Sequence, residues 1–163
     1  MSAREAQQIE ELILSSYEAM YRLAYSYAGN EDDAMDIVQE SVYKAIKNAP
    51  SVTSPQYRKT WLWRIVINTS LDCLRKKQTE IPFYEVRESA AWDRYTDIDT
   101  RKALNVLDER ERTVIVLRFF EDRKITEIAK ILNLNTNTIK SILYRSLYKL
   151  KMELSEGDFL YEG

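Results

Sequence analysis

Apolar residues recur every three or four positions through the first half of the chain, which is the spacing of one face of an α-helix. The predicted helices cover about 7–28, 31–49 and 57–77, separated by Gly29-Asn30 and by the loop from Pro50 to Pro55. Asn30 can cap the second helix, because its side chain can accept a backbone N–H of the first turn. Connections this short let three amphipathic helices bury a common core, so we expect residues 1–78 to form one small helical domain.

The composition favours an all-α fold for the whole chain. Only 3 glycines and 3 prolines occur in 163 residues, while 45% of the residues are hydrophobic, which is typical of helices joined by short connections. Histidine, the commonest general base and zinc ligand, does not occur in the sequence. We therefore expect a protein that is not an enzyme, with no catalytic residue, metal or cofactor.

Sequence features of export and membrane insertion are missing. The single Cys73 cannot form an internal disulfide, and the amino terminus lacks the basic start and apolar run of a secretion signal. No apolar run approaches the roughly 20 residues that a membrane helix needs. We expect a cytoplasmic protein that does not insert into a membrane itself.

Acidic residues concentrate in the second predicted helix, although the net charge of the chain is only -2. The acidic residues are Glu31, Asp32, Asp33, Asp36 and Glu40. Negative charge stabilises the start of a helix, and the remaining carboxylates offer a face for a protein partner. A metal site is the less simple interpretation, because histidine and a glycine-rich ligand loop are both missing.

Helical periodicity fails between residues 79 and 98, which we interpret as a linker. Its carboxylates suit a segment lying in a basic channel of a partner, but they equally suit a solvated tether. Periodicity then returns over 99–154, with a break near Asp108, and predicts a second helical domain. Residues 155–163 are left as a tail.

The second domain ends in the spacing of a helix-turn-helix unit. A short helix from Ile125 to Leu132 and a turn at 133–135 precede a longer helix from Thr136 to about Leu154. Asn133 stands in the turn where glycine is usual, and Asn135 or Thr136 can cap the second helix. The residues predicted to form the buried face of that helix are Ile139, Ile142, Leu143, Leu147 and Leu150.

The other face of the last helix carries donors suited to DNA. Its residues are Thr138, Lys140, Ser141, Tyr144, Arg145 and Lys149. Lysine and arginine can donate to guanine edges or phosphates, and hydroxyl groups can reach either. A solvated basic face is the alternative, but the preceding turn and short helix favour DNA.

The predicted helix over 57–77 also has two chemically different faces. Trp63, Ile67, Leu71 and Leu74 form the apolar one, whereas Thr60, Arg64, Asn68, Asp72 and Arg75 form the polar one. The helix could simply be a tryptophan-rich core helix with a charged exterior. Asn68 favours a binding role, because its amide could pair with an unstacked base and the Ser51–Ser54 loop could complete the pocket.

Three segments of the chain, in this order and spacing, resemble a known family. Asp33-Ala34-Met35-Asp36-Ile37-Val38-Gln39-Glu40 and Thr60-Trp61-Leu62-Trp63-Arg64-Ile65-Val66-Ile67-Asn68 resemble the second conserved region of extracytoplasmic-function sigma factors. The helix-turn-helix at 125–150 resembles the fourth region of those factors. The resemblance implies a bacterial transcription initiation factor that binds core RNA polymerase and directs it to a promoter with two elements.

The resemblance also implies roles for individual residues. It assigns polymerase clamp binding to Asp36, Gln39 and Glu40, and polymerase flap binding to the segment 104–120. It assigns capture of a flipped -10 base to Val52, Thr53, Ser54 and Asn68, with Arg64 and Arg75 on the same DNA-facing helix. It assigns the major groove of the -35 element to Lys140, Ser141, Tyr144 and Arg145, beside Thr138 and Lys149. An anti-sigma factor, membrane-anchored as is usual in the family, is expected to hold the chain at the inner face of the membrane until an envelope or environmental signal arrives.

The chain departs from the family pattern at Lys124, where a serine or threonine helix cap is frequent, and at Lys140, where arginine is common. Met35 replaces a frequent acidic residue. The details of -35 preference are therefore open. Two other classes also remain: a stand-alone helix-turn-helix regulator with an amino-terminal ligand-binding or dimerisation domain, and a protein-interaction adaptor, which would leave both basic faces unexplained.

Overall fold

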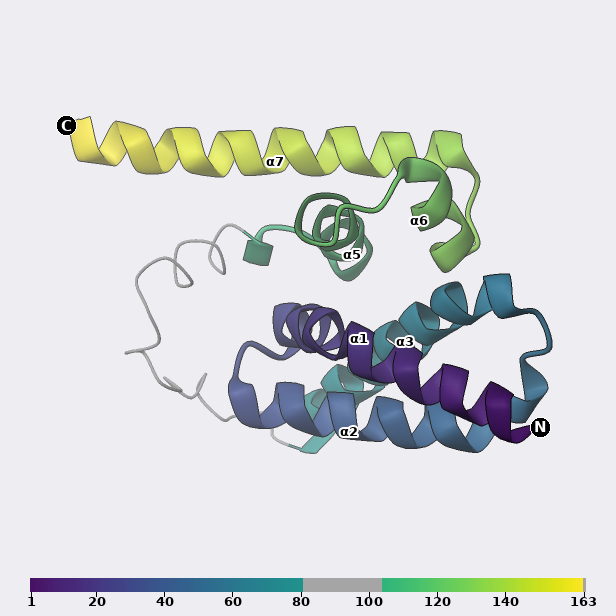
Figure 1. The fold of residues 1–163 in the computed structure, drawn as a ribbon. Helices are drawn as coiled ribbons and strands as arrows, with labels where there is room; N and C mark the ends of the chain where they lie inside the picture. Colours follow the sequence, from purple (N-terminus) through teal and green to yellow (C-terminus); the bar gives the residue numbers. More distant parts are fainter. Residues whose placement is uncertain (81–103, 163) are drawn as a thin grey trace. The chain divides into compact units, whose positions relative to one another are not determined.

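The computed structural model of the chain describes residues 1–80 and 104–162, which fall into two compact units, Met1–Glu85 and Val86–Gly163. Every regular element in the described part of the chain is a helix (Figure 1). This confirms the predicted all-α class with two small helical domains. The predicted linker over 79–98 lies outside the described residues, apart from its first two positions.

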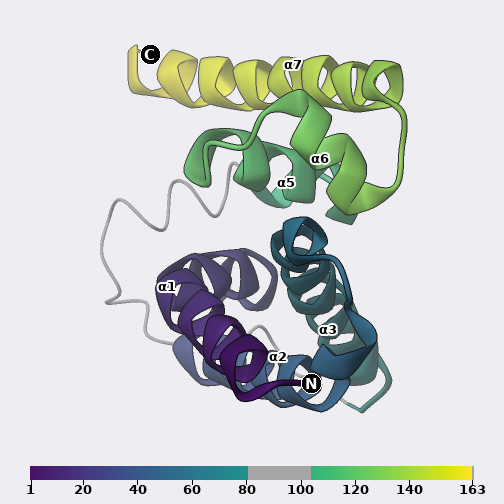
Figure 2. The same ribbon diagram turned by 45° about the vertical axis from the view of Figure 1, so that its right-hand side comes forward.

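Three long helices build the first unit. They are α1 (Ala3–Ala28), α2 (Glu31–Asn48) and α3 (Arg58–Glu80), with the 3-10 turns η1 (Ala49–Ser51) and η2 (Pro55–Tyr57) between α2 and α3. Each long helix packs against the other two, as Figure 2 shows. Met20, Leu23, Ile37, Val38 and Val66 form the centre of the core, each 2% exposed or less. Full burial of each such side chain stabilises the fold by about 1.5–3 kcal/mol.

Local capping explains where the first helices begin and end. Helix α1 begins four residues earlier than predicted, because Ser2 and Glu5 form a reciprocal capping box. It ends at Gly29, whose φ of 77° is readily adopted only by glycine. Asn30 then accepts the backbone N–H of Asp33 at 2.9 Å and caps α2, as predicted.

The apolar periodicity of α2 predicts a buried face made of Ala34, Ile37, Val38, Ser41, Val42, Ala45 and Ile46. This prediction is wrong at Ile46, which is 61% exposed. The buried stripe runs through Ser41, Ala45 and Ala49 instead. Ile46 follows Val42 by one turn, and Val42 is itself only half-buried, so both residues lie at the edge of the stripe.

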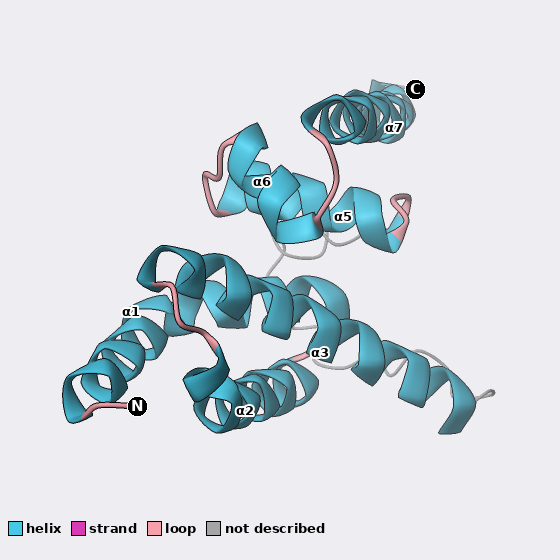
Figure 3. Ribbon diagram, turned by 90° about the vertical axis from the view of Figure 1, so that its right-hand side faces the viewer, coloured by secondary structure: helices cyan, strands magenta, loops and turns pink. Residues whose placement is uncertain are grey.

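The second unit is built on shorter helices that pack against one long one. Its elements are α5 (Glu109–Ile115), the π-helical turn η3 (Val116–Phe120), α6 (Ile125–Leu132) and α7 (Thr136–Glu162). The break predicted near Asp108 is confirmed, because Asp108 caps α5 in a capping box with Glu111. Helix α7 packs against α5 and α6 (Figure 3). The most deeply buried core residues are Val114, Val116, Leu117, Ile128 and Ile139.

The turn between α6 and α7 has the predicted chemistry. Asn133 has a φ of 55° and ends α6 in the left-handed conformation, which asparagine tolerates better than most residues. The side chain of Asn135 accepts the backbone N–H of Thr138 at 2.7 Å, so Asn135 is the cap of α7. Helix α7 continues through the predicted tail to Glu162.

The buried face predicted for α7 needs one correction. Ile139, Ile142 and Leu143 are buried as expected, and Leu150 is half-buried. Leu147, however, is 37% exposed. Ser146 is fully buried in its place and donates its hydroxyl to the carbonyl of Ile142 at 2.6 Å, so a small polar residue occupies the inner face there.

Candidate nucleic-acid interfaces

The loop after α2 is held by its own backbone. The N–H of Val52 donates to the carbonyl of Ala49 at 3.1 Å, and the N–H of Tyr57 donates to the carbonyl of Ser54 at the same distance. Val52 is half-buried, whereas Thr53 and Ser54 are exposed. The loop therefore presents two hydroxyl groups and one partly covered apolar side chain from a fixed backbone.

Helix α3 carries the two faces that its sequence predicts. Trp63 and Ile67 are 3% and 5% exposed, so they anchor the helix in the core of the first unit. Asn68 lies on the exposed side, and Arg64 is half-buried one turn before it. An amide and a guanidinium group thus occupy neighbouring turns of a rigidly packed helix.

Tyr57 joins this face, although the sequence did not predict it. The OH of Tyr57 accepts a hydrogen bond from Nη1 of Arg64, and the guanidinium carbon of Arg64 lies 5.3 Å from the centre of the Tyr57 ring. Such a contact restrains the arginine side chain beside the loop. The only sequence signal was the seven-residue spacing, which is two helical turns.

The end of α3 is basic, but its charges have partners within the unit. Arg75 donates to Asp72 at 3.4 Å, three residues earlier on the helix. Lys77 forms an ion pair with Asp33 at the start of α2. The basic stretch therefore contributes to packing between α2 and α3 as well as to the surface charge.

The acidic surface of α2 lies open to solvent. Asp36, Gln39 and Glu40 are all exposed. These three residues form a single negative face available to a partner.

Burial raises the pKa of the Cys73 thiol on α3, and the nearby charge of Asp36 raises that pKa further. Cys73 is half-buried, as expected for a small structural side chain.

The predicted DNA-facing side of α7 divides into two groups. Lys140, Ser141 and Tyr144 are exposed, and Thr138 is half-buried. Arg145 and Lys149 were expected to stand on the same solvated face. They are instead ion-paired with one carboxylate, that of Glu111 on α5.

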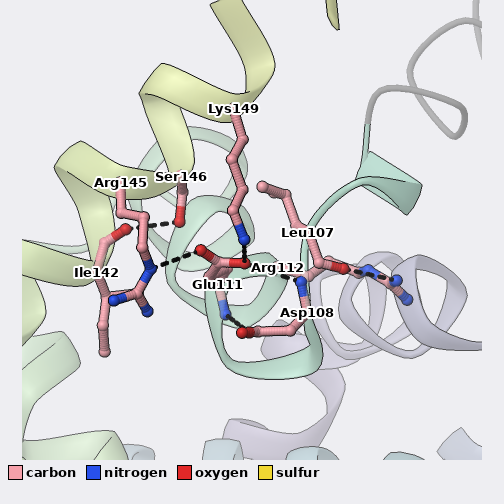
Figure 4. Close-up of polar contacts among 8 residues, drawn as sticks. All are labelled: Leu107, Asp108, Glu111, Arg112, Ile142, Arg145, Ser146 and Lys149. Atoms are coloured by element: carbon pink, nitrogen blue, oxygen red, sulfur yellow. Dashed lines mark hydrogen bonds and ion pairs between the residues drawn. The ribbon is translucent and has the colours of Figure 1, made fainter. Parts of the chain in front are cut away.

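The Glu111 carboxylate is the most deeply buried charge in the described part of the second unit, with a side-chain exposure of 0%. It accepts Nε of Arg145 at 2.8 Å, Nζ of Lys149 at 2.8 Å and the backbone N–H of Asp108 at 3.0 Å (Figure 4). Burial acts to raise the pKa of Glu111, but the hydrogen bonds from Lys149, Arg145 and Asp108 outweigh it and lower the pKa to about 2. The carboxylate therefore stays ionised.

The sequence marks Glu111 only as the last residue of an Asp-x-x-Glu pattern that begins at Asp108. This pattern predicts a helix capping box and nothing further about Glu111. Its pairing with Arg145 and Lys149 spans 34 and 38 residues. No local pattern reports a contact of that separation. The interaction also raises the pKa of Arg145, chiefly through its hydrogen bond to Glu111.

Within the described residues, no helix is both long and apolar enough to cross a membrane. Nor do these residues contain a group of three or more cysteine or acidic side chains placed to hold a metal ion.

Comparison with known proteins gives the same division of the chain. Residues 12–80 match the family model described as Sigma-70 region 2, and residues 103–152 match that described as Sigma-70, region 4. The chain is 43% identical over 142 residues to the RNA polymerase sigma factor SigV of Bacillus subtilis, covering 85% of this chain and 86% of that protein. It is 30% identical over 158 residues to the ECF RNA polymerase sigma factor SigW of the same organism, and this match covers 84% of this chain and 83% of that protein.

Solved structures agree on the fold. The sigma factor RpoE of Bartonella quintana, determined in complex with the anti-sigma factor NepR, superposes with a TM-score of 0.75 at 27% identity, covering 90% of this chain and 96% of that one. CnrH, determined with the cytosolic domain of CnrY, superposes with a TM-score of 0.75 at 23% identity and covers 94% of each chain. The chain therefore belongs to the sigma-70 family of RNA polymerase sigma factors, and within it to the extracytoplasmic-function (ECF) group.

Proposed function

We propose that this sigma factor binds core RNA polymerase and directs it to promoters by reading the -10 element with its first unit and the -35 element with its second. The observation that carries the proposal is the pairing of region 2 and region 4 in one chain, each with an exposed polar face on a packed helix. Its relatives are named as polymerase sigma factors. A role as initiation factor, with no catalytic chemistry of its own, follows from that kinship.

For the -10 element, the proposed pocket combines the 52–54 loop with Asn68. Val52 supplies a partly covered apolar surface, while Thr53, Ser54 and Asn68 supply exposed hydrogen-bonding groups. Hydrogen bonds to the edge of a base that enters such a pocket offset part of the free energy of unstacking that base. Promoter melting would then begin at this base.

The strand on either side of that base would run along the polar face of α3. Arg64 is restrained by Tyr57 beside the loop, and Arg75 is exposed three turns further on. Guanidinium groups bind phosphates with two parallel hydrogen bonds. We assign Arg64 and Arg75 to the strand backbone, because that contact does not require a particular base.

For the -35 element, the exposed residues near the amino end of α7 are the proposed readers. Lys140, Ser141 and Tyr144 stand in the part of the helix that enters the major groove in helix-turn-helix proteins, with Thr138 beside them. Arg145 directly follows Tyr144, and its side chain is 53% exposed despite its ion pair. Lys149, one turn further, is assigned to the phosphate backbone.

Two faces are proposed for the polymerase. The exposed Asp36, Gln39 and Glu40 would bind the clamp, which requires a complementary basic surface. The segment 104–120 would bind the flap. The carboxyl end of this segment exposes Phe119 and Phe120 at 55% and 49%, and paired exposed aromatic side chains are typical of protein interfaces.

An anti-sigma factor is the proposed regulator. The sigma factor RpoE was solved in complex with the anti-sigma factor NepR, and CnrH was solved in complex with the cytosolic domain of CnrY. A membrane-anchored anti-sigma factor would hold this chain in the cytoplasm at the inner face of the membrane until a signal releases it. The proposal predicts that a soluble fragment of that regulator competes with core polymerase for the chain.

The rival class is a helix-turn-helix regulator that binds duplex DNA on its own. Gel-shift titration on a promoter fragment with and without core polymerase separates the two. The sigma proposal expects specific binding only when polymerase is present, because few phosphate contacts are available to the isolated chain. Tight, specific binding by the isolated chain would favour the regulator.

Asp36→Lys should weaken assembly with polymerase, and Glu31→Lys on the same helix is its matched control.

A further inference from the structure

Two basic residues of the proposed -35 face share one buried anion. Arg145 and Lys149 lie one turn apart on α7, and Glu111 comes from α5 beneath them (Figure 4). The carboxylate is completely buried, whereas the Arg145 and Lys149 side chains are 53% and 40% exposed. Two cations and one carboxylate leave a net charge of +1 facing solvent, so the cluster keeps an attraction for a polyanion.

The two cations use their donors differently. Arg145 binds Glu111 through Nε, at 2.8 Å from Oε2. A guanidinium group has five N–H donors, and Nε carries only one of them. The contact to Glu111 therefore leaves the four donors of the terminal nitrogens Nη1 and Nη2 unused by this carboxylate. Lys149 places its single nitrogen, Nζ, 2.8 Å from Oε1 of the same carboxylate.

The anion itself is held firmly. Its Oε1 also accepts the backbone N–H of Asp108 at 3.0 Å, while the backbone N–H of Glu111 donates to Oδ1 of Asp108 at 2.8 Å. Both bonds belong to the capping box that starts α5. The capping box and burial beneath α7 both restrict the Glu111 side chain, so Arg145 binds a carboxylate with a fixed position.

We infer that Glu111 is a positioning residue for promoter recognition: it fixes the inner edge of the Arg145 guanidinium so that Nη1 and Nη2 are presented to the -35 element. The inference rests on the proposed DNA role of Arg145. An arginine held before binding loses less side-chain freedom when the DNA arrives, and its two terminal nitrogens match the paired acceptors of guanine. Lys149 balances the charge of Glu111 and has a secondary role.

The test compares three variants in holoenzyme with core polymerase. They are Glu111→Gln, which removes the charge but can keep the capping box; Glu109→Gln, a matched change on the exposed side of α5; and Arg145→Ala. The readout is the ratio of transcription from a promoter recognised by the wild type to transcription from the same promoter with a scrambled -35 element. Glu111→Gln should lower this ratio about threefold to tenfold, a part of what a well-placed arginine contact contributes. Glu109→Gln should leave the ratio unchanged.

A double variant shows whether the effect passes through Arg145. If Glu111 acts by positioning Arg145, adding Glu111→Gln to Arg145→Ala should cause little further loss of the ratio. A full, additive loss in the double variant would overturn the inference. Activity on the scrambled promoter reports whether each variant still folds and binds polymerase.

Arg145→Lys provides a second route that leaves Glu111 untouched. A lysine has one nitrogen, so it cannot bind Glu111 and present a two-pronged donor to DNA at the same time. It should lower the ratio as far as Arg145→Ala does, and retention of more than half of the wild-type ratio would overturn the inference. If Arg145→Ala itself leaves the ratio unchanged, the proposed DNA role of Arg145 fails. If Arg145→Ala lowers it and Glu111→Gln does not, only the positioning role fails.

Discussion

At the scale of single residues, the three arginines of the proposed DNA faces each contact a neighbouring side chain. Arg64 is held by Tyr57, Arg75 by Asp72 and Arg145 by Glu111. Replacing one partner therefore changes the position of the other as well as the local charge. Exposed pairs such as Asp72 and Arg75 contribute little to stability, typically below about 1 kcal/mol, whereas the buried Glu111 carboxylate depends on its partners.

The lowered pKa of Glu111 predicts how stability depends on pH. Its pKa is about 2 in the folded chain against an ordinary value of 4.5, so its ionised form stabilises the fold. That contribution is fully present above pH 4.5 and is lost as the pH falls through about 2. The stability difference between wild type and Glu111→Gln should thus be constant above pH 5 and shrink below it. Hydrogen exchange of α5 amides measures this, and a difference that persists unchanged at pH 2 would contradict it.

A second prediction at this scale concerns Asn68. Asn68→Ala should lower the rate of promoter opening about tenfold, because it removes a proposed base contact. Affinity for core polymerase should be unchanged, because alanine has a higher helix propensity than asparagine and the helix is retained. Reactivity of unpaired -10 thymines towards permanganate measures opening. Glu10→Ala, at an exposed position of α1 outside the proposed DNA and polymerase faces, is the control. Equal losses of opening and polymerase binding by Asn68→Ala would exclude the pocket.

At the scale of the elements, local signals explain the helix ends and the helix-turn-helix turn. Gly29, Asn30, Asn133 and Asn135 each do what their residue type favours at a helix end. The π-helical turn η3 was not predictable in this way. There the N–H of Glu121 donates to the carbonyl of Val116 at 3.0 Å, a five-residue spacing that leaves no mark in the apolar periodicity.

Asn133 offers a prediction about the turn itself. Its φ of 55° is strained for alanine, so Asn133→Ala should destabilise the second unit by about 1–2 kcal/mol. Asn133→Gly should be neutral or slightly stabilising, because glycine adopts this conformation without a steric penalty. Hydrogen exchange of α6 and α7 amides gives the free energies of opening. An alanine variant as stable as wild type would show that the turn can relax.

At the scale of the whole molecule, the all-α class, the two domains and the family follow from periodicity and motif order. Short-range chemistry was predictable because the interacting groups lie within one or two turns of each other. Burial was mispredicted at Ile46 and Leu147, which lie at the edges of their apolar stripes, where neighbouring helices decide exposure. The pairing of Glu111 with Arg145 and the contact of Tyr57 with Arg64 were missed because tertiary packing brings them together.

The central claim concerns the chain acting through polymerase at two promoter elements. Run-off transcription with purified core polymerase and genomic promoter fragments tests it most directly, with the -10 and -35 elements of each active promoter then scrambled separately. The account predicts transcripts that require this chain, that fall sharply when either element is scrambled, and that are lost when the chain is omitted. Transcripts that are the same with and without the chain, or that ignore both elements, would contradict it.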